Sequence, residues 1–163
     1  MDDLLLLART DADAIDIVIT DTDLALAEAE ATETLEAVAA TVGVRLALDL
    51  QPAPVRGDEA RLRQLAGILV DNAIRHSAAG GRMTVTVRPG ALLTVDDEGP
   101  GIAPEYLERV FERFWRAPGA PAEGSGLGLA IARWIAERHR GTIHAQNRSP
   151  DPGARFVVRL PPG

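Results

Sequence analysis

The stretch from Val95 to Ile102 constrains this chain more than any other. An apolar run leads into three carboxylates and then breaks at Gly-Pro-Gly. Strand side chains alternate between faces, so Asp97 is expected on the same side as Leu93 and Val95. A buried carboxylate is costly without hydrogen bonds. The glycines that follow let the backbone of this stretch come close to the group that bonds the carboxylate. The stretch alone also fits an ordinary strand end followed by a turn.

The composition limits the classes of protein to which this chain can belong. The chain has 163 residues, enough for one good core, with 46% hydrophobic and 25% charged residues, as in folded proteins. Its formal net charge of -7 argues against broad binding to nucleic acid or an anionic membrane, so we expect neither nucleic-acid partners nor direct membrane contact. It has no cysteine, which excludes thiolate catalysis and sulfur-ligated metals. Without a spanning segment or signal peptide we expect a cytoplasmic domain, whose full-length parent could be anchored in the cell membrane.

Hydrophobic periodicity predicts the secondary structure. Strands are expected at residues 15–20, 44–50, 83–88, 91–95, 142–146 and 155–160, and helices at 24–42, 59–76, 103–113 and 126–140. Leu62, Leu65, Leu69 and Ala73 give the 59–76 helix an apolar stripe. We expect Asp58 to cap the start of that helix and Gly43 to end the 24–42 helix. This order fits a sheet with helices packed on one face. The leucine-rich residues 2–9 resemble the end of a longer helix that packs against a partner. We expect His139 at a solvated helix end and His144 in a strand.

Polar residues at the end of the 59–76 helix form a first candidate site. Asn72 and His76 are four residues apart and share a helical face, with Arg75 beside them. An amide oxygen, a guanidinium and an imidazole there suit a hydrated cation and phosphates, although a polar helix end would look the same.

Two further segments carry unusual residues. Residues 110–116 hold Phe111, Phe114 and Trp115, which fit a small hydrophobic cluster that anchors a loop. Residues 124–129, Gly-Ser-Gly-Leu-Gly-Leu, open a helix and expose backbone N–H groups, as anion sites do. A Rossmann site is excluded because the preceding strand is missing, and a Walker site because no lysine follows.

Together these motifs resemble a known family. Asn72 in LVDNAIRH, Asp97-x-Gly99-x-Gly101, Phe111-x-Arg113-Phe114 and Gly124-x-Gly126-Leu127-Gly128 follow the order and spacing of the sensor histidine kinases. They look like that family's asparagine box, first glycine box, phenylalanine box and second glycine box. Residues 153–156, Gly-Ala-Arg-Phe, are similar to its last glycine box, with alanine where threonine is usual.

The resemblance implies an α/β (α+β) two-layer sandwich, in which a mixed, mostly antiparallel sheet packs against three helices. This is the Bergerat-type fold of gyrase-type ATPases and heat-shock chaperones. Residues 1–10 would be the end of a dimerisation helix and residues 11–163 the catalytic ATP-binding domain, with an ATP lid at about 103–124. Asp97 would accept a hydrogen bond from the adenine amino group. Asn72 would hold Mg²⁺, and Arg113 would contact the γ-phosphate.

The resemblance implies two catalytic residues, Asn72 and Arg113. The implied ATP-binding residues are Asn72, Arg75, His76, Asp97, Gly99, Gly101, Ile102, Phe114, Arg116, Gly124, Ser125, Gly126, Leu127, Gly128 and Leu129.

Two departures refine the expected function. Ile68 stands where the family often has a second asparagine, and where related ATPases have a water-activating glutamate, so hydrolysis by that route is disfavoured. His76, His139 and His144 are the chain's histidines, and none resembles a phosphoacceptor. We therefore expect a histidine kinase catalytic domain that binds ATP and Mg²⁺. It would phosphorylate a histidine on a dimerisation domain that is absent from this chain, and a response regulator would be a further partner. The alternatives are an anti-sigma-type serine kinase and a regulatory ATP-binding module.

Overall fold

The computed structural model describes residues 3–11, 15–119 and 126–163. Its helices are α1 (Asp3–Asp11), α2 (Leu24–Val42), α3 (Glu59–His76) and α4 (Gly128–Arg138), with two 3-10 turns, η1 (Pro104–Tyr106) and η2 (Arg109–Phe111). The strands are β1 (Thr20–Asp23), β2 (Arg45–Leu50), β3 (Pro54–Gly57), β4 (Arg82–Arg88), β5 (Leu92–Asp96), β6 (Thr142–Asn147) and β7 (Ala154–Arg159).

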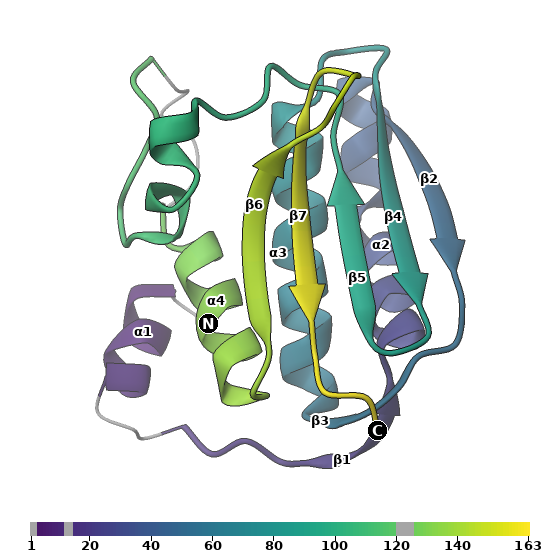
Figure 1. The fold of residues 1–163 in the computed structure, drawn as a ribbon, viewed down its shortest axis with the longest axis vertical. Coiled ribbons are helices and arrows are strands. Elements are labelled where there is room, and N and C mark those ends of the chain that lie inside the picture. Colours follow the sequence, from purple (N-terminus) through teal and green to yellow (C-terminus); the bar gives the residue numbers. More distant parts are fainter. Residues whose placement is uncertain (1–2, 12–14, 120–125) are drawn as a thin grey trace.

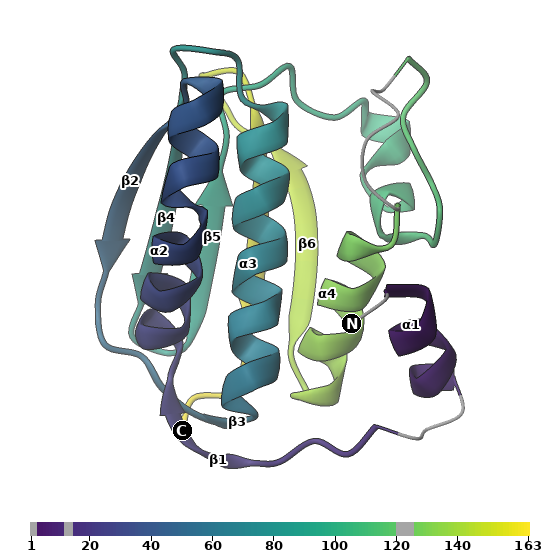
Figure 2. The same ribbon diagram turned by 180° about the vertical axis from the view of Figure 1, so that it is seen from behind.

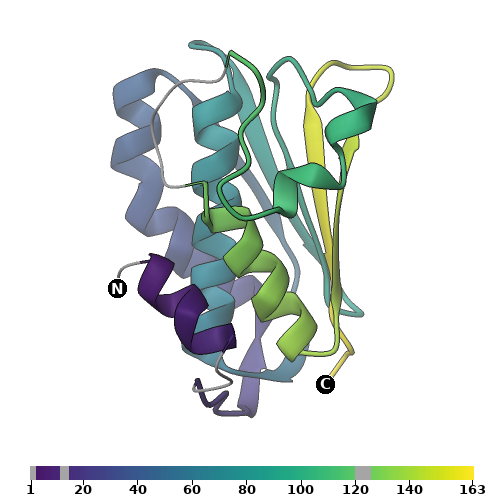
Figure 3. The same ribbon diagram turned by 90° about the vertical axis from the view of Figure 1, so that its left-hand side faces the viewer.

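Five of the strands form one mixed sheet in the order β2-β4-β5-β7-β6. The β2–β4 pair is parallel, and the β4–β5, β5–β7 and β6–β7 pairs are antiparallel. Helices α2, α3 and α4 cover one face of this sheet, and no helix of the described residues lies on the other face (Figures 1, 2 and 3). The predicted two-layer sandwich with a mixed, mostly antiparallel sheet is therefore confirmed.

The core lies between the helical layer and the sheet. On α3 the predicted apolar stripe of Leu62, Leu65, Leu69 and Ala73 is at most 1% exposed. Burial alternates along β4 and β5, as expected for strands with one face covered. The buried stripe of α3 therefore packs against the buried sides of β4 and β5, in the middle of the sheet.

Helix ends follow from local capping. Asp23 caps α2 by accepting the backbone N–H of Ala25 at 2.8 Å, and Gly43 ends it in the left-handed conformation with φ 76°. Asp58 caps α3 by accepting the N–H of Arg61 at 3.1 Å. Both α2 and α3 therefore have the predicted bounds.

His139 is not at a solvated helix end, so that prediction was wrong. Its side chain is buried between the end of α4 and the start of α3. Nε2 accepts the backbone N–H of Asp58 at 3.0 Å, and Nδ1 bonds the carbonyl of Ile135 at 2.7 Å. The Asp58 carboxylate caps α3 through Oδ1, and its Oδ2 accepts the backbone N–H of Val18 at 3.0 Å. This bond holds the segment before β1 against the start of α3. His144 lies in β6 as predicted.

Three other predictions need correction. Residues 15–19 form no strand; the strand is β1, because only Thr20–Asp23 can pair with the four residues of β3. Residues 103–113 form two 3-10 turns, and Glu112 has extended backbone with ψ 144° that ends the second. The last helix begins at Gly128, since Gly126 is left-handed with φ 73°.

Helix α1 packs against α4 within the chain (Figure 3). Leu6 and Leu7 are buried, whereas Leu4 and Leu5 on the other face are about half exposed. No helix in the described part of the chain combines the length and apolar character needed to cross a membrane.

A buried carboxylate on α2 should make the stability of the fold depend on pH. Glu28 is fully buried, and neither carboxyl oxygen has a hydrogen-bond partner within the described residues. Burial raises the pKa of Glu28 to about 8. The folded chain thus keeps a proton that the unfolded chain loses near its ordinary pKa of 4.5, so stability falls as the pH rises through this window.

We expect Glu28→Gln to flatten this dependence. The substitution should remove up to about 1.4 kcal/mol per pH unit from the slope of the unfolding free energy against pH. Urea unfolding at pH 5, 6.5 and 8 measures it, with Glu36→Gln, exposed on the same helix, as the control. Equal slopes for Glu28→Gln and the parent would contradict the prediction.

Candidate functional site

Asp97 is the buried carboxylate at the end of β5. It is 2% exposed, in line with Leu93 and Val95 as predicted. Its Oδ1 accepts the backbone N–H groups of Gly99 at 2.9 Å and Ala154 at 3.1 Å. Within the described residues Oδ2 accepts no hydrogen bond, which leaves one carboxylate oxygen available to a ligand.

Asp96 points to the opposite face and serves a different purpose. Its two carboxyl oxygens bind the Arg155 guanidinium at 2.7 and 3.0 Å across the β5–β7 pair. The ion pair lies on the opposite side of β5 from the buried Val95. The alternation of the strand therefore separates a structural ion pair from a carboxylate available to a ligand.

Two glycines bring other backbone against Asp97. A Cβ on Gly99 would collide with the carbonyl oxygen of His76, and a Cβ on Gly153 would collide with the carbonyl oxygen of Asp97. Glycine is required at both positions for these close approaches. The loop after β5 is thereby packed against the end of α3 on one side and the start of β7 on the other.

The end of α3 contributes polar side chains beside this loop. The Asn72 side chain is half-buried and forms no hydrogen bond to the described residues, so its amide is available to a ligand. Arg75 pairs with Asp71 at 3.0 Å along the helix, and His76 is exposed. The His76–Gly99 packing places the predicted Asn72 group next to the predicted Asp97 group.

The segment 103–119 is anchored by aromatic contacts. Phe111 is buried and meets Phe156 edge-on, with ring centroids 6.1 Å apart. Tyr106 and Trp115 pack at 5.1 Å. The expected hydrophobic cluster is therefore present, although Phe114, with φ 63°, is 59% exposed.

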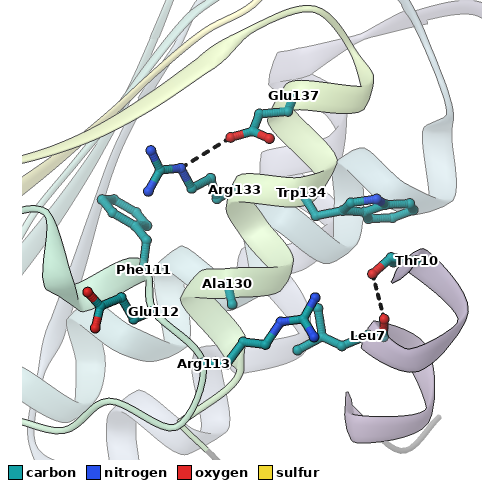
Figure 4. Close-up of a pocket in the computed structure, with 9 residues that line it drawn as sticks. All are labelled: Leu7, Thr10, Phe111, Glu112, Arg113, Ala130, Arg133, Trp134 and Glu137. Atoms are coloured by element: carbon teal, nitrogen blue, oxygen red, sulfur yellow. Dashed lines mark hydrogen bonds and ion pairs between the residues drawn. The ribbon is translucent and has the colours of Figure 1, made fainter. Parts of the chain in front are cut away.

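Arg113 lies in a groove between α1 and α4 (Figure 4). The groove has a volume of about 470 Å³, and neither Asp97 nor Asn72 lines it. Arg113 extends beside Ala130 and Leu7. In this structure Arg113 is thus not gathered with Asp97 and Asn72. Arg116 is exposed.

The start of α4 lies close to the end of segment 103–119. Phe114 donates its backbone N–H to the Gly126 carbonyl at 2.9 Å, and a Cβ on Gly126 would come within 3.0 Å of the Phe114 Cα. Leu127 is buried, while Gly128 and Leu129 are half-buried. Gly124 and Ser125, two predicted site residues, lie outside the described residues.

The last residue of β6 and the residue after it supply contacts that the sequence did not reveal. Arg148 donates to the carbonyl of Asp97 at 2.9 Å, and Asn147 bonds both backbone groups of Ile102. The only available signal was a cluster of polar and turn residues before the last strand. No group of three or more His, Cys, Asp or Glu that could hold a metal occurs in the described ranges.

Comparison with known proteins identifies the family. The model of the family described as "Histidine kinase-, DNA gyrase B-, and HSP90-like ATPase" matches residues 57–163. The chain belongs to this family. The sensor protein kinase PmrB of Pseudomonas aeruginosa is 36% identical over 165 residues, which cover 99% of this chain and 35% of PmrB. The sensor protein SphS of Synechococcus elongatus is 44% identical over 119 residues, covering 66% of this chain and 29% of SphS.

Solved structures agree with this assignment. The mycobacterial sensor histidine kinase MprB is 32% identical with a TM-score of 0.79, over 89% of this chain and 98% of that one. Full-length ShkA in complex with AMPPNP is 28% identical with a TM-score of 0.80, over 99% of this chain and 35% of ShkA. The chain has the sequence and fold of the ATP-binding catalytic domain of a sensor histidine kinase. It spans about a third of the length of the curated relatives described above.

The packing of Gly99 against α3 gives a testable prediction. We expect Gly99→Ala to lower the free energy of unfolding by about 2 kcal/mol or more, because the methyl group overlaps a backbone carbonyl that cannot move independently. Gly67→Ala in α3 is the control: its Cβ meets nothing within 4 Å, and alanine favours a helix by about 1 kcal/mol. Denaturant unfolding measures both, and a Gly99→Ala variant as stable as the parent would refute the packing argument.

Proposed function

We propose that this domain binds ATP with Mg²⁺ and donates the γ-phosphoryl group to a histidine on a dimerisation domain outside this chain. The observation that carries the proposal is the buried Asp97 carboxylate, with one oxygen held by two backbone N–H groups and the other available. Family membership supports ATP as the ligand, and the structure of ShkA in complex with AMPPNP agrees with it.

Asp97 would read the adenine base. An ionised carboxylate only accepts hydrogen bonds, so it pairs with the amino group of adenine and opposes the carbonyl of guanine. Its bonds to Gly99 and Ala154 fix the carboxylate in one orientation, which favours a single base geometry. Gly101 and Ile102 complete the loop beside the base.

The phosphates would lie between the end of α3 and the start of α4. Asn72 fits a Mg²⁺ ligand because its half-buried amide forms no hydrogen bond to described residues. Bound Mg²⁺ would neutralise charge on the phosphate oxygens. Arg75 and His76 would contact phosphate and nucleotide. Backbone N–H groups at Gly126, Leu127, Gly128 and Leu129, with Gly124 and Ser125, would face the phosphates. Catalysis then consists of positioning and charge neutralisation.

Residues 103–124 would form the ATP lid, with Phe114, Arg113 and Arg116 turned to the nucleotide. Because the Arg113 guanidinium lies in the α1–α4 groove, a γ-phosphate contact requires the side chain to leave that groove.

The exposed Leu4 and Leu5 support the assignment of residues 1–10 as the end of a dimerisation helix, before the catalytic domain of residues 11–163.

The partners would be the dimerisation and phosphoacceptor domain of the same kinase and a response regulator, in the cytoplasm.

Ile68, beside the Asn72 face of α3, cannot take a proton from water, which favours transfer to a protein over ATP hydrolysis. The alternatives are a serine kinase of the anti-sigma type and an ATP-binding module that only regulates contacts.

We expect Asp97→Asn to weaken ATP binding at least about tenfold, because a hydrogen bond to a charged acceptor contributes about 1.5–3 kcal/mol. Calorimetric titration with ATP and Mg²⁺ measures the affinity. Asp96→Asn is the matched control, since that carboxylate bonds Arg155 on the other face. Equal affinity of the Asp97→Asn variant and the parent, or equal binding of GTP and ATP by the parent, would defeat the adenine assignment.

Phosphoryl transfer is tested by mixing this chain with a separate dimerisation domain and ATP labelled at the γ-phosphate. We expect acid-labile label on a histidine of that domain, and none when Asn72→Ala replaces the parent. Acid-stable label on a serine of a partner would favour the serine kinase, and an absence of label on either would favour the regulatory module.

A further inference from the structure

The last residue of β6 clamps the backbone where segment 103–119 begins. The Asn147 side chain accepts the N–H of Ile102 through Oδ1 at 2.7 Å and donates from Nδ2 to the carbonyl of Ile102 at 2.7 Å. A side-chain amide bonded to both groups of one residue reproduces the pairing of peptide groups in neighbouring strands. Ile102 is therefore tied to the edge of the sheet although it belongs to no strand.

The backbone next to the clamp is shaped around it. Gly101 has φ 80°, and a Cβ there would lie 2.7 Å from Oδ1 of Asn147. Only glycine tolerates both the left-handed conformation and this approach. Asn147 is exposed, so its two hydrogen bonds, and not burial of its side chain, hold this contact.

The neighbouring residue holds the other end of the same loop. Arg148 donates to the carbonyl oxygens of Asp97 at 2.9 Å and Pro152 at 3.1 Å. Asn147 and Arg148 are adjacent in sequence, yet they bind opposite ends of the loop from Asp97 to Ile102. Asn147 and Arg148 consequently fix the spacing between the buried Asp97 carboxylate and the start of segment 103–119.

We propose that Asn147 is a positioning residue that sets how segment 103–119 leaves the Asp97 loop, and so where that segment lies relative to the nucleotide phosphates. The inference rests on the proposed function. Its effect falls on the phosphate end of the ligand, because Asp97 keeps its own bonds to Gly99, Ala154 and Arg148 when Asn147 is changed.

The clamp itself can be tested without nucleotide. In Asn147→Ala we expect the Ile102 amide to exchange its hydrogen about tenfold faster, as expected for the loss of its acceptor. Gln146→Ala, an exposed neighbour in the same strand, is the control and should leave this rate unchanged. Thermal unfolding should show the same midpoint for both variants, and unchanged exchange at Ile102 in Asn147→Ala would overturn the proposal.

The positioning role is tested by comparing ATP with adenosine in titrations of the parent, Asn147→Ala and Gln146→Ala. We expect Asn147→Ala to lose about five- to tenfold in ATP affinity while its adenosine affinity changes less than about twofold. Equal losses for both ligands, or no loss for ATP, would overturn the role of Asn147. Failure of the parent itself to bind ATP would instead overturn the proposed function on which the inference rests.

Discussion

The need to hydrogen-bond one buried carboxylate organises this end of the molecule. Asp97 can be inside only because two backbone N–H groups, from Gly99 and Ala154, converge on a single oxygen. One donor lies two residues later in the chain and the other 57 residues later. Satisfying Asp97 therefore requires both the turn after β5 and the correct register of β7.

Other contacts of the site follow from the same requirement. Gly153 must lack a side chain because the Asp97 carbonyl occupies that space, and Gly99 must lack one because α3 ends there. These approaches bring the helix that carries Asn72 to the loop that carries Asp97. The catalytic domain thus couples its two proposed ligand contacts through backbone packing, without any direct bond between the two side chains among the contacts described.

Much of the fold could be predicted because its signals are local. The alternation in β5 identified Asp97 as the inward carboxylate, and the Leu62, Leu65 and Leu69 stripe fixed the buried face of α3. Capping by Asp58 and Gly43 marked two helix ends. The family motifs supplied the candidate residues of the site.

The remaining features depend on contacts between distant residues. The β-branched run at residues 15–19 has high strand propensity, but β3 offers it no partner beyond Thr20. His139 is buried because Gly57 and Asp58, about 80 residues earlier, leave room and a donor for its ring. Asn147 and Ile102 are 45 residues apart, so nothing near either residue indicates their pairing.

The pairing of β5 with β7 has a consequence for how the chain folds. The β4–β5 and β6–β7 hairpins close short loops, whereas joining them across β5 and β7 brings together residues about 60 positions apart. Closing a longer loop costs more chain entropy, so the β5–β7 pairing carries the larger entropic cost. Asp97 receives its Ala154 bond only when β7 is paired with β5 in register. The proposed adenine site thus depends on the strand pairing that spans the largest separation along the sequence in this sheet.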